Sequence, residues 1–284
     1  MVDASDRRLL AAILLLSGLG GLVKIVGGVF YGSRALFVDA LTSIANFVSI
    51  IATVYYYRKS LLPPDLDHHY GHHRLGFGGA FTTIMAYSFV AGLSVWELAL
   101  IEPYTVSPLA PFFALLGLVF YAIAISLSRR AGEYFTPYAV FTVSELIEST
   151  TVIAASLLGS IYYYLIDYVG ALIIVGYLFY ELYDIARDFI KVMSDIAPEP
   201  GLVRDIKREI EDMGPRVMSI RLRMLRRNYY QGDIVIRVDP SMSVEEAHRI
   251  ADEIERILRQ KYNVDVIVHI EPCKDASWAS GGQG

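Results

Sequence analysis

A polar stretch of nine residues, 65–73, holds four of the six histidines in the chain. Its sequence, DLDHHYGHH, also contains two aspartates, and Asp and Gly interleave the histidines, unlike the unbroken run of an artificial tag. Neutral imidazole is a ligand for Zn, Fe, Ni and Cu, and carboxylates also suit harder ions. The stretch therefore predicts a metal-binding loop, with a solvated polar loop as the alternative.

Acidic residues also lie within two strongly apolar segments. An acid at the centre of a bilayer costs about 2.5 to 3.5 kcal/mol on insertion scales, so such residues point to function. In each segment the spacing of three to four residues places the polar side chains on one helical face. Two such faces meeting inside a bundle could coordinate a cation through oxygen atoms and water. The first set is Asp39, Thr42 and Asn46, and the second is Glu145, Glu148 and Ser149.

Some of these polar residues can also be interpreted as structural. Hydroxyl residues such as Thr42 and Ser149 also serve as small residues for close helix packing in membranes. Lys24, in the first apolar segment, could pair with one of the acids or extend to the membrane interface, and we expect a structural role for it.

The elements that carry these residues are predicted by hydropathy. The chain of 284 residues is 54% hydrophobic and 19% charged, and its mean hydropathy is +0.42. Several windows of about 20 apolar residues, each long enough to span a bilayer, precede residue 195. We expect six spans, at about 9–31, 36–57, 75–100, 109–127, 138–166 and 169–192.

Basic residues predict the orientation of these spans. They gather before the first span, around the loop that follows the second, after the fourth and at the end of the sixth, whereas the opposite side shows only Arg34. By the positive-inside rule, both termini and the histidine-rich loop are cytoplasmic, and the loops around residues 102–107 and Asp167 face outward.

Beyond residue 195 the pattern changes to that of a small soluble fold. A Pro-interrupted linker, 195–201, is followed by a helix at 203–213, strands at 217–225 and 233–238 with a turn at 231–232, a helix from Ser243 to about 261 and a strand at 264–269. Glu246, three residues after Ser243, predicts a capping box. The fold class is thus an all-α six-helix transmembrane bundle plus a C-terminal α+β domain of ferredoxin-like order α-β-β-α-β, with domains at 1–195 and 196–273 and a disordered tail at 274–284.

Composition excludes several classes. The single Cys273 excludes disulfides within the chain and any Cys-rich metal site. A net charge of −5 gives no support for nucleic acid as a partner. The soluble part shows neither a nucleophile–base constellation nor a phosphate-binding glycine loop, so we expect no enzyme. Without a signal peptide or transit segment, we expect a multi-pass protein of the plasma membrane.

Two motifs carry a family resemblance. The segments 64–74 (PDLDHHYGHHR) and 266–272 (VIVHIEP), with six spans and an α+β tail, resemble the cation diffusion facilitator family of divalent-metal transporters. The resemblance implies a metal site in the cytoplasmic loop and another in a dimerising tail, where Glu271 stands at the position of a usual Asp and Arg237 at that of a common His. The implied ligands are Asp65, His68 and His72 in the loop and His248, His269 and Glu271 in the tail.

The transport site departs from that family. Members pair Asp or His with Asp four residues later in the second span and His with Asp in the fifth, whereas Thr42 with Asn46 and Glu145 with Ser149 take those places here. A shift of one residue would instead select Ser144 and Glu148. No histidine lies within a span in either register, and an all-oxygen site suits Mn, Mg or Fe(II) better than Zn.

The resemblance implies a homodimeric secondary transporter that exports a divalent cation (Zn, Mn, Fe(II) or similar) from the cytoplasm in exchange for protons. Divalent metals would be both substrate and regulator, and proton exchange would depend on Glu145 or Glu148. The alternative is a transport-inactive relative that acts as a metal sensor or as the partner subunit of an active paralogue, which the substituted site favours.

Overall fold

The computed structural model describes residues 4–100, 102–130, 136–226 and 228–273. The chain divides into two compact units: Met1–Pro63 with Leu75–Arg187, and Pro64–Arg74 with Asp188–Gly284. The histidine-rich loop therefore belongs to the same unit as the C-terminal domain. The expected disordered tail at 274–284 lies outside the described residues.

Six long helices make up most of the first unit, although the last residues of the sixth, from Asp188 on, are assigned to the second unit. They are α1 (Ala4–Phe30), α2 (Arg34–Ser60), α3 (Gly78–Ala99), α4 (Ala110–Arg130), α5 (Thr136–Ile161) and α6 (Tyr164–Met193). Within the described residues, five of them (all but α5) have a stretch long and apolar enough to cross a membrane. The expected six-helix bundle is confirmed.

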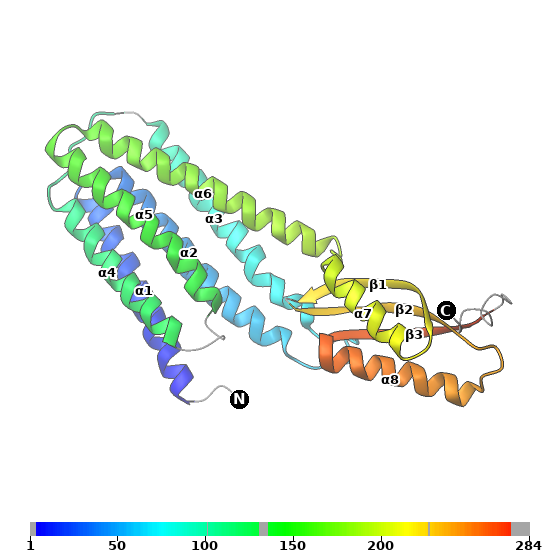
Figure 1. The fold of residues 1–284 in the computed structure, drawn as a ribbon. Helices are drawn as coiled ribbons and strands as arrows, with labels where there is room; N and C mark the ends of the chain where they lie inside the picture. The colour runs from blue at the N-terminus through cyan, green and yellow to red at the C-terminus, as the bar shows by residue number, and fades with distance from the viewer. Residues whose placement is uncertain (1–3, 101, 131–135, 227, 274–284) are drawn as a thin grey trace. The chain divides into compact units, whose positions relative to one another are not determined.

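Helix α2 occupies the middle of the packing, with contacts to α1, α3 and α5, while α4 packs on α1 and α5 (Figure 1). Small residues allow close approach between helices: a Cβ added at Gly170 of α6 would lie 2.3 Å from the Cβ of Ala155 in α5. This packing places the polar face of α2 against that of α5.

The expected break between the fifth and sixth spans was wrong by several residues. Helix α5 ends at Ile161 and α6 begins at Tyr164, so Asp167 lies in the first turn of α6 and not in an outward loop. Asp167 is fully buried and accepts hydrogen bonds from Ser33 and Tyr104, so solvent is not needed to satisfy its carboxylate. The charge of Asp167 was therefore not evidence for a solvent-exposed loop at this position.

The second unit contains a three-stranded sheet and two helices. They are α7 (Pro200–Asp212), β1 (Arg216–Arg226), β2 (Tyr229–Val238), α8 (Val244–Tyr262) and β3 (Val264–Pro272). The strand order is β1-β2-β3, antiparallel for the first pair and parallel for the second. The predicted α-β-β-α-β order is confirmed, and so is the capping box of Ser243 and Glu246. Apolar side chains from both helices and all three strands form the core, among them Ile206, Ile210, Ile234, Ile236, Ile254 and Leu258.

The turn expected at residues 231–232 was also wrong. Gly232 lies inside β2, opposite Leu222 of β1. A Cβ at this position would be 1.8 Å from the carbonyl oxygen of Arg221, so the glycine permits close approach of two strands and does not form a turn. The reversal instead contains Asn228, whose φ is +57°.

Candidate metal centres

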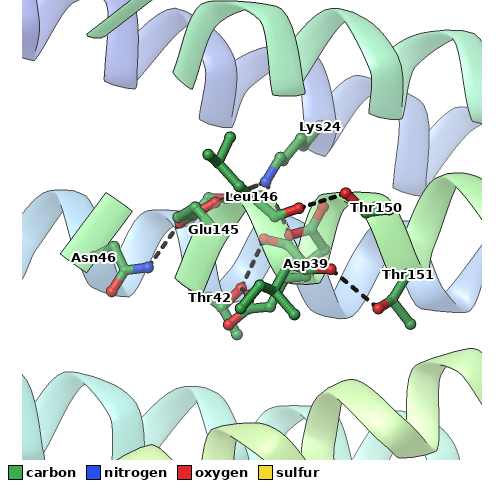
Figure 2. A network of polar contacts seen from close by, with 11 residues as sticks. Lys24, Asp39, Thr42, Asn46, Glu145, Leu146, Thr150 and Thr151 are labelled. Atoms are coloured by element: carbon green, nitrogen blue, oxygen red, sulfur yellow. Dashed lines mark hydrogen bonds and ion pairs between the residues drawn. The ribbon is translucent and has the colours of Figure 1, made fainter. Parts of the chain in front are cut away.

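The polar faces of α2 and α5 meet in the interior of the helix bundle. Asp39, Glu145 and Glu148 are 0%, 1% and 2% exposed. Asn46 Nδ2 donates to Glu145 Oε1 at 2.7 Å, and Thr42 Oγ1 donates to Glu148 Oε2 at 2.8 Å (Figure 2). Two helices separated by about a hundred residues thus contribute polar side chains to one buried cluster.

Two oxygen atoms of this cluster remain without a hydrogen bond among the described residues: Asp39 Oδ2 and Ser149 Oγ. Buried polar atoms are almost always paired, so such atoms invite an explanation, and a metal ligand is one. All six candidate residues on α2 and α5 are buried. Ser144, which the alternative register selects, has a side chain outside the described set.

A cation already enters the cluster from α1. The Lys24 ammonium donates to Glu145 Oε2 at 2.7 Å, to Asp39 Oδ1 at 2.9 Å and to Ser43 Oγ at 3.1 Å. Figure 2 shows its nitrogen directed at the two carboxylates. Of the two expectations for Lys24, pairing with the acids is what the structure shows. The charge in an apolar segment was visible in the sequence, but its contact with the candidate site was not.

Two further polar residues lie beside the cluster, and sequence reasoning missed both. The Tyr87 hydroxyl of α3 donates to Asn46 Oδ1, and Tyr87 is 1% exposed. Glu181 of α6 is half-buried and lies within electrostatic reach of Tyr87 and Glu148. The available signal was an acid amid the apolar residues of α6, as for Asp39 in α2.

The loop of the second unit forms a separate three-ligand group. Ligand atoms of Asp65, His68 and His72 all lie within 4.8 Å of one another. Asp65 Oδ1 is 3.2 Å from His68 Nδ1, and Asp65 Oδ2 is 3.3 Å from His72 Nε2. A carboxylate with two imidazoles is a suitable set for Zn, Fe or Mn.

The loop backbone prepares this carboxylate for a cation. Loss of solvation acts to raise the pKa of Asp65, but hydrogen bonds from the backbone N–H groups of His68 and Asp67 outweigh it and hold the pKa below its usual value. His73 faces elsewhere, with its ring 4.8 Å from that of Tyr229. The group therefore uses two of the four loop histidines.

The tail residues do not form a comparable group within one chain. His248 and His269 are exposed, His248 Nε2 lies 3.5 Å from Asp252 Oδ2, and Glu271 Oε2 lies 3.8 Å from Arg237 Nε. Among the described residues, the loop trio is the only group of three or more His, Cys, Asp or Glu residues close enough to hold one ion.

Buried acids within a six-helix bundle, followed by an α+β domain, define the architecture of a multi-pass cation transporter. Residues 9–194 match the cation efflux transmembrane domain, and residues 198–273 match the cation efflux protein cytoplasmic domain. The chain belongs to the cation efflux family, the cation diffusion facilitators, and the predicted resemblance is confirmed.

Similar proteins cover nearly the whole chain. The manganese efflux system protein MneP of Bacillus subtilis is 25% identical over 95% of this chain and 98% of its own length. The manganese efflux system protein MneS of the same organism is 27% identical over 93% of each chain. The cation-efflux pump FieF of Shewanella oneidensis is 23% identical over 88% of each.

Proposed function

We propose that this chain exports a hard divalent cation, Mn²⁺ first among them, through the buried cluster between α2 and α5. The observation that carries the proposal is the donor set. Asp39, Glu145 and Glu148 supply carboxylates, and the other buried polar side chains of the cluster on α2 and α5 supply hydroxyl and amide oxygens. Oxygen ligands suit Mn²⁺, Mg²⁺ and Fe²⁺, whereas Zn²⁺ prefers imidazole and thiolate. The manganese efflux proteins MneP and MneS support this choice.

The transport cycle would follow the general logic of secondary transporters. Helix movements expose a site near the midplane first to one side of the membrane and then to the other. Unpaired carboxylates are costly in a low-dielectric interior, so the empty site needs positive charge for its return. Protons on Glu145 or Glu148 would supply such charge and make the protein a proton exchanger.

The second unit would act as the dimer and regulatory domain. We place it and both termini in the cytoplasm of a cell whose plasma membrane holds a homodimer. The loop trio would bind a regulatory divalent metal. His248, His269 and Glu271 are candidates for a site that a second copy completes, because these side chains lie at or near the surface within one chain.

Transport by sealed vesicles tests the proposal. Purified protein is reconstituted in liposomes with an internal metal indicator and a pH dye, and external Mn²⁺, Fe²⁺, Co²⁺, Ni²⁺, Cd²⁺ and Zn²⁺ are supplied in turn. Uptake should be fastest for Mn²⁺, and Glu145→Gln and Glu148→Gln should each lower the initial rate by about tenfold or more, because each removes a charged ligand.

Thr150→Ala is the matched control on the same helix. Thr150 is exposed and its hydroxyl donates to Leu146 O of its own helix, so the rate should stay at the wild-type level. Wild-type rates in both glutamine variants would overturn the site assignment.

One observation favours the second candidate, a transport-inactive sensor or partner subunit. The Lys24 ammonium occupies two of the acids that cargo would need. If the purified protein moves no ion while the loop still binds metal, this second function becomes the better one.

A further inference from the structure

The buried cluster contains a cation that belongs to the protein itself, the ammonium group of Lys24. Lys24 is completely buried, and its ammonium donates to three oxygen atoms, on Asp39, Ser43 and Glu145. An ammonium has three N–H donors and no acceptor, so all three donors are used. Its partners come from two helices, while the lysine itself comes from a third.

The bundle provides a path for the lysine side chain. A Cβ at Gly117 of α4 would lie 2.8 Å from Lys24 Cγ and 3.0 Å from its Cε, so the absence of a side chain there leaves room for the lysine stem. The ammonium also lies 4.6 Å from the centre of the Tyr121 ring, on the same helix as Gly117. The aromatic face stabilises a cation without using the acids.

These contacts conflict with metal binding at the same atoms. A divalent ion bound to Asp39 Oδ1 and Glu145 Oε2 would lie where the ammonium lies now. Two cations within a few ångströms repel strongly in a protein interior. Cargo can therefore take these oxygens only when the ammonium leaves them.

We propose that Lys24 is a tethered counter-cation of the transport site, which holds Asp39 and Glu145 while the site is empty and is displaced by the incoming divalent ion. The proposal deepens the transport function above and relies on the same site. The ammonium stabilises two buried carboxylates that would otherwise face each other unpaired. On displacement it can keep its contact with the Tyr121 ring.

The ammonium supplies one positive charge next to Asp39 and Glu145, so the empty site already holds part of the charge that a divalent ion would bring. The competition also reduces the affinity for cargo, because only the fraction of molecules with a displaced ammonium is competent to bind. A site that binds less tightly releases its ion more readily.

The test measures Mn²⁺ binding by full-length protein in detergent micelles. His68→Ala and His72→Ala are present throughout, to remove the loop trio. Lys24→Met should lower the dissociation constant for Mn²⁺ by about tenfold or more, because the competitor is gone. Lys24→Arg keeps the charge, so its dissociation constant for Mn²⁺ should stay close to that of the parent, the protein that carries only the two histidine substitutions. Lys191→Met, the same substitution at an exposed lysine, is the matched control.

Thermal unfolding provides a second readout. Without metal, Lys24→Met should unfold at a lower temperature than the parent, and Mn²⁺ should raise its unfolding temperature more than it raises that of the parent. Lys24→Gln keeps N–H donors but has no charge. It should show the same two changes in unfolding temperature as Lys24→Met. Unchanged or weaker Mn²⁺ binding in Lys24→Met would overturn the proposal. So would a failure of both variants to fold even with Mn²⁺ present, because the ammonium would then have a role that no cargo ion replaces.

Transport by vesicles that contain the wild-type protein distinguishes failure of the counter-cation proposal from failure of the proposed transport function. If they transport Mn²⁺ while Lys24→Met binds it no more tightly, the counter-cation proposal fails and the proposed function stands. If they transport no ion while Lys24→Met binds Mn²⁺ more tightly, the competition is real and the transport function fails.

Discussion

Asp167 in the first turn of α6 caps the start of α2 through Ser33. Asp167 Oδ1 accepts from Ser33 Oγ at 2.6 Å, and Oδ2 accepts from the backbone N–H of Arg34 at 2.8 Å. Ser33 Oγ itself accepts from the backbone N–H of Leu36 at 3.1 Å. One carboxylate and one hydroxyl thus satisfy the first N–H groups of a helix that carries half of the candidate transport site.

Asp167→Ala should destabilise the bundle by about 2 to 4 kcal/mol, because it leaves several buried donors without an acceptor. Asp167→Asn, which retains one acceptor oxygen, should cost less. Thermal unfolding of the purified protein in micelles measures both. Equal unfolding temperatures for Asp167→Ala and the wild type would contradict this role.

His72→Ala should remove one bound metal ion per chain, because it takes one of the three ligands of the loop group. His69→Ala changes a histidine of the same loop outside that group, and should leave the stoichiometry as it is. Metal content after dialysis, measured by atomic emission, tests both variants. An equal loss in His69→Ala would show that the loop binds metal without the selected geometry.

The loop site should lose its metal on acidification, because imidazole must be neutral to bind a cation. The pKa of Asp65 is held below its usual value, so protonation of this carboxylate should not be what releases the metal in mildly acidic solution. Release that starts only below pH 4 would assign the site to carboxylates.

The capping box of α8 predicts a second pH effect. Hydrogen bonds from the Ser243 hydroxyl and backbone N–H lower the pKa of Glu246 below its usual value. The Glu246 carboxylate therefore binds a proton less readily in the folded state than in the unfolded state. Its contribution to stability is present above about pH 4.3 and is lost as the pH falls below that value. Ser243→Ala should flatten that dependence in hydrogen exchange of the α8 amides. The same dependence in wild type and variant would assign the effect to other carboxylates.

Gly232→Ala should destabilise the second unit by about 2 kcal/mol or more, because the added methyl group collides with the β1 backbone at Arg221. Gly201→Ala is the matched control, since no atom lies within 4 Å of a Cβ placed there. Hydrogen exchange of the β1 and β2 amides measures both. Unchanged protection in Gly232→Ala would mean that β1 and β2 accommodate the added methyl group without loss of stability.

Much of the architecture followed from local patterns in the chain. Long apolar runs identified the helices, because a membrane span needs only length and hydropathy. A spacing of three residues puts Asp39 with Thr42, and Glu145 with Glu148, on single faces, since helix geometry repeats every 3.6 residues. The Ser243 capping box was equally local. The break before α6 was missed because aromatic residues at 162–163 continue the apolar run without a turn signal.

Contacts between distant segments could not be read in this way. Lys24 meets Asp39 and Glu145 across 15 and 121 positions, and only the packing of α1 against α2 and α4 decides that its ammonium points inward. The role of Gly232 depends equally on a neighbouring strand. Hydropathy and periodicity are properties of one segment, so the chain alone specified the helices and their polar faces. Which charges face one another depends on how those faces pack, and that was decided by the tertiary structure.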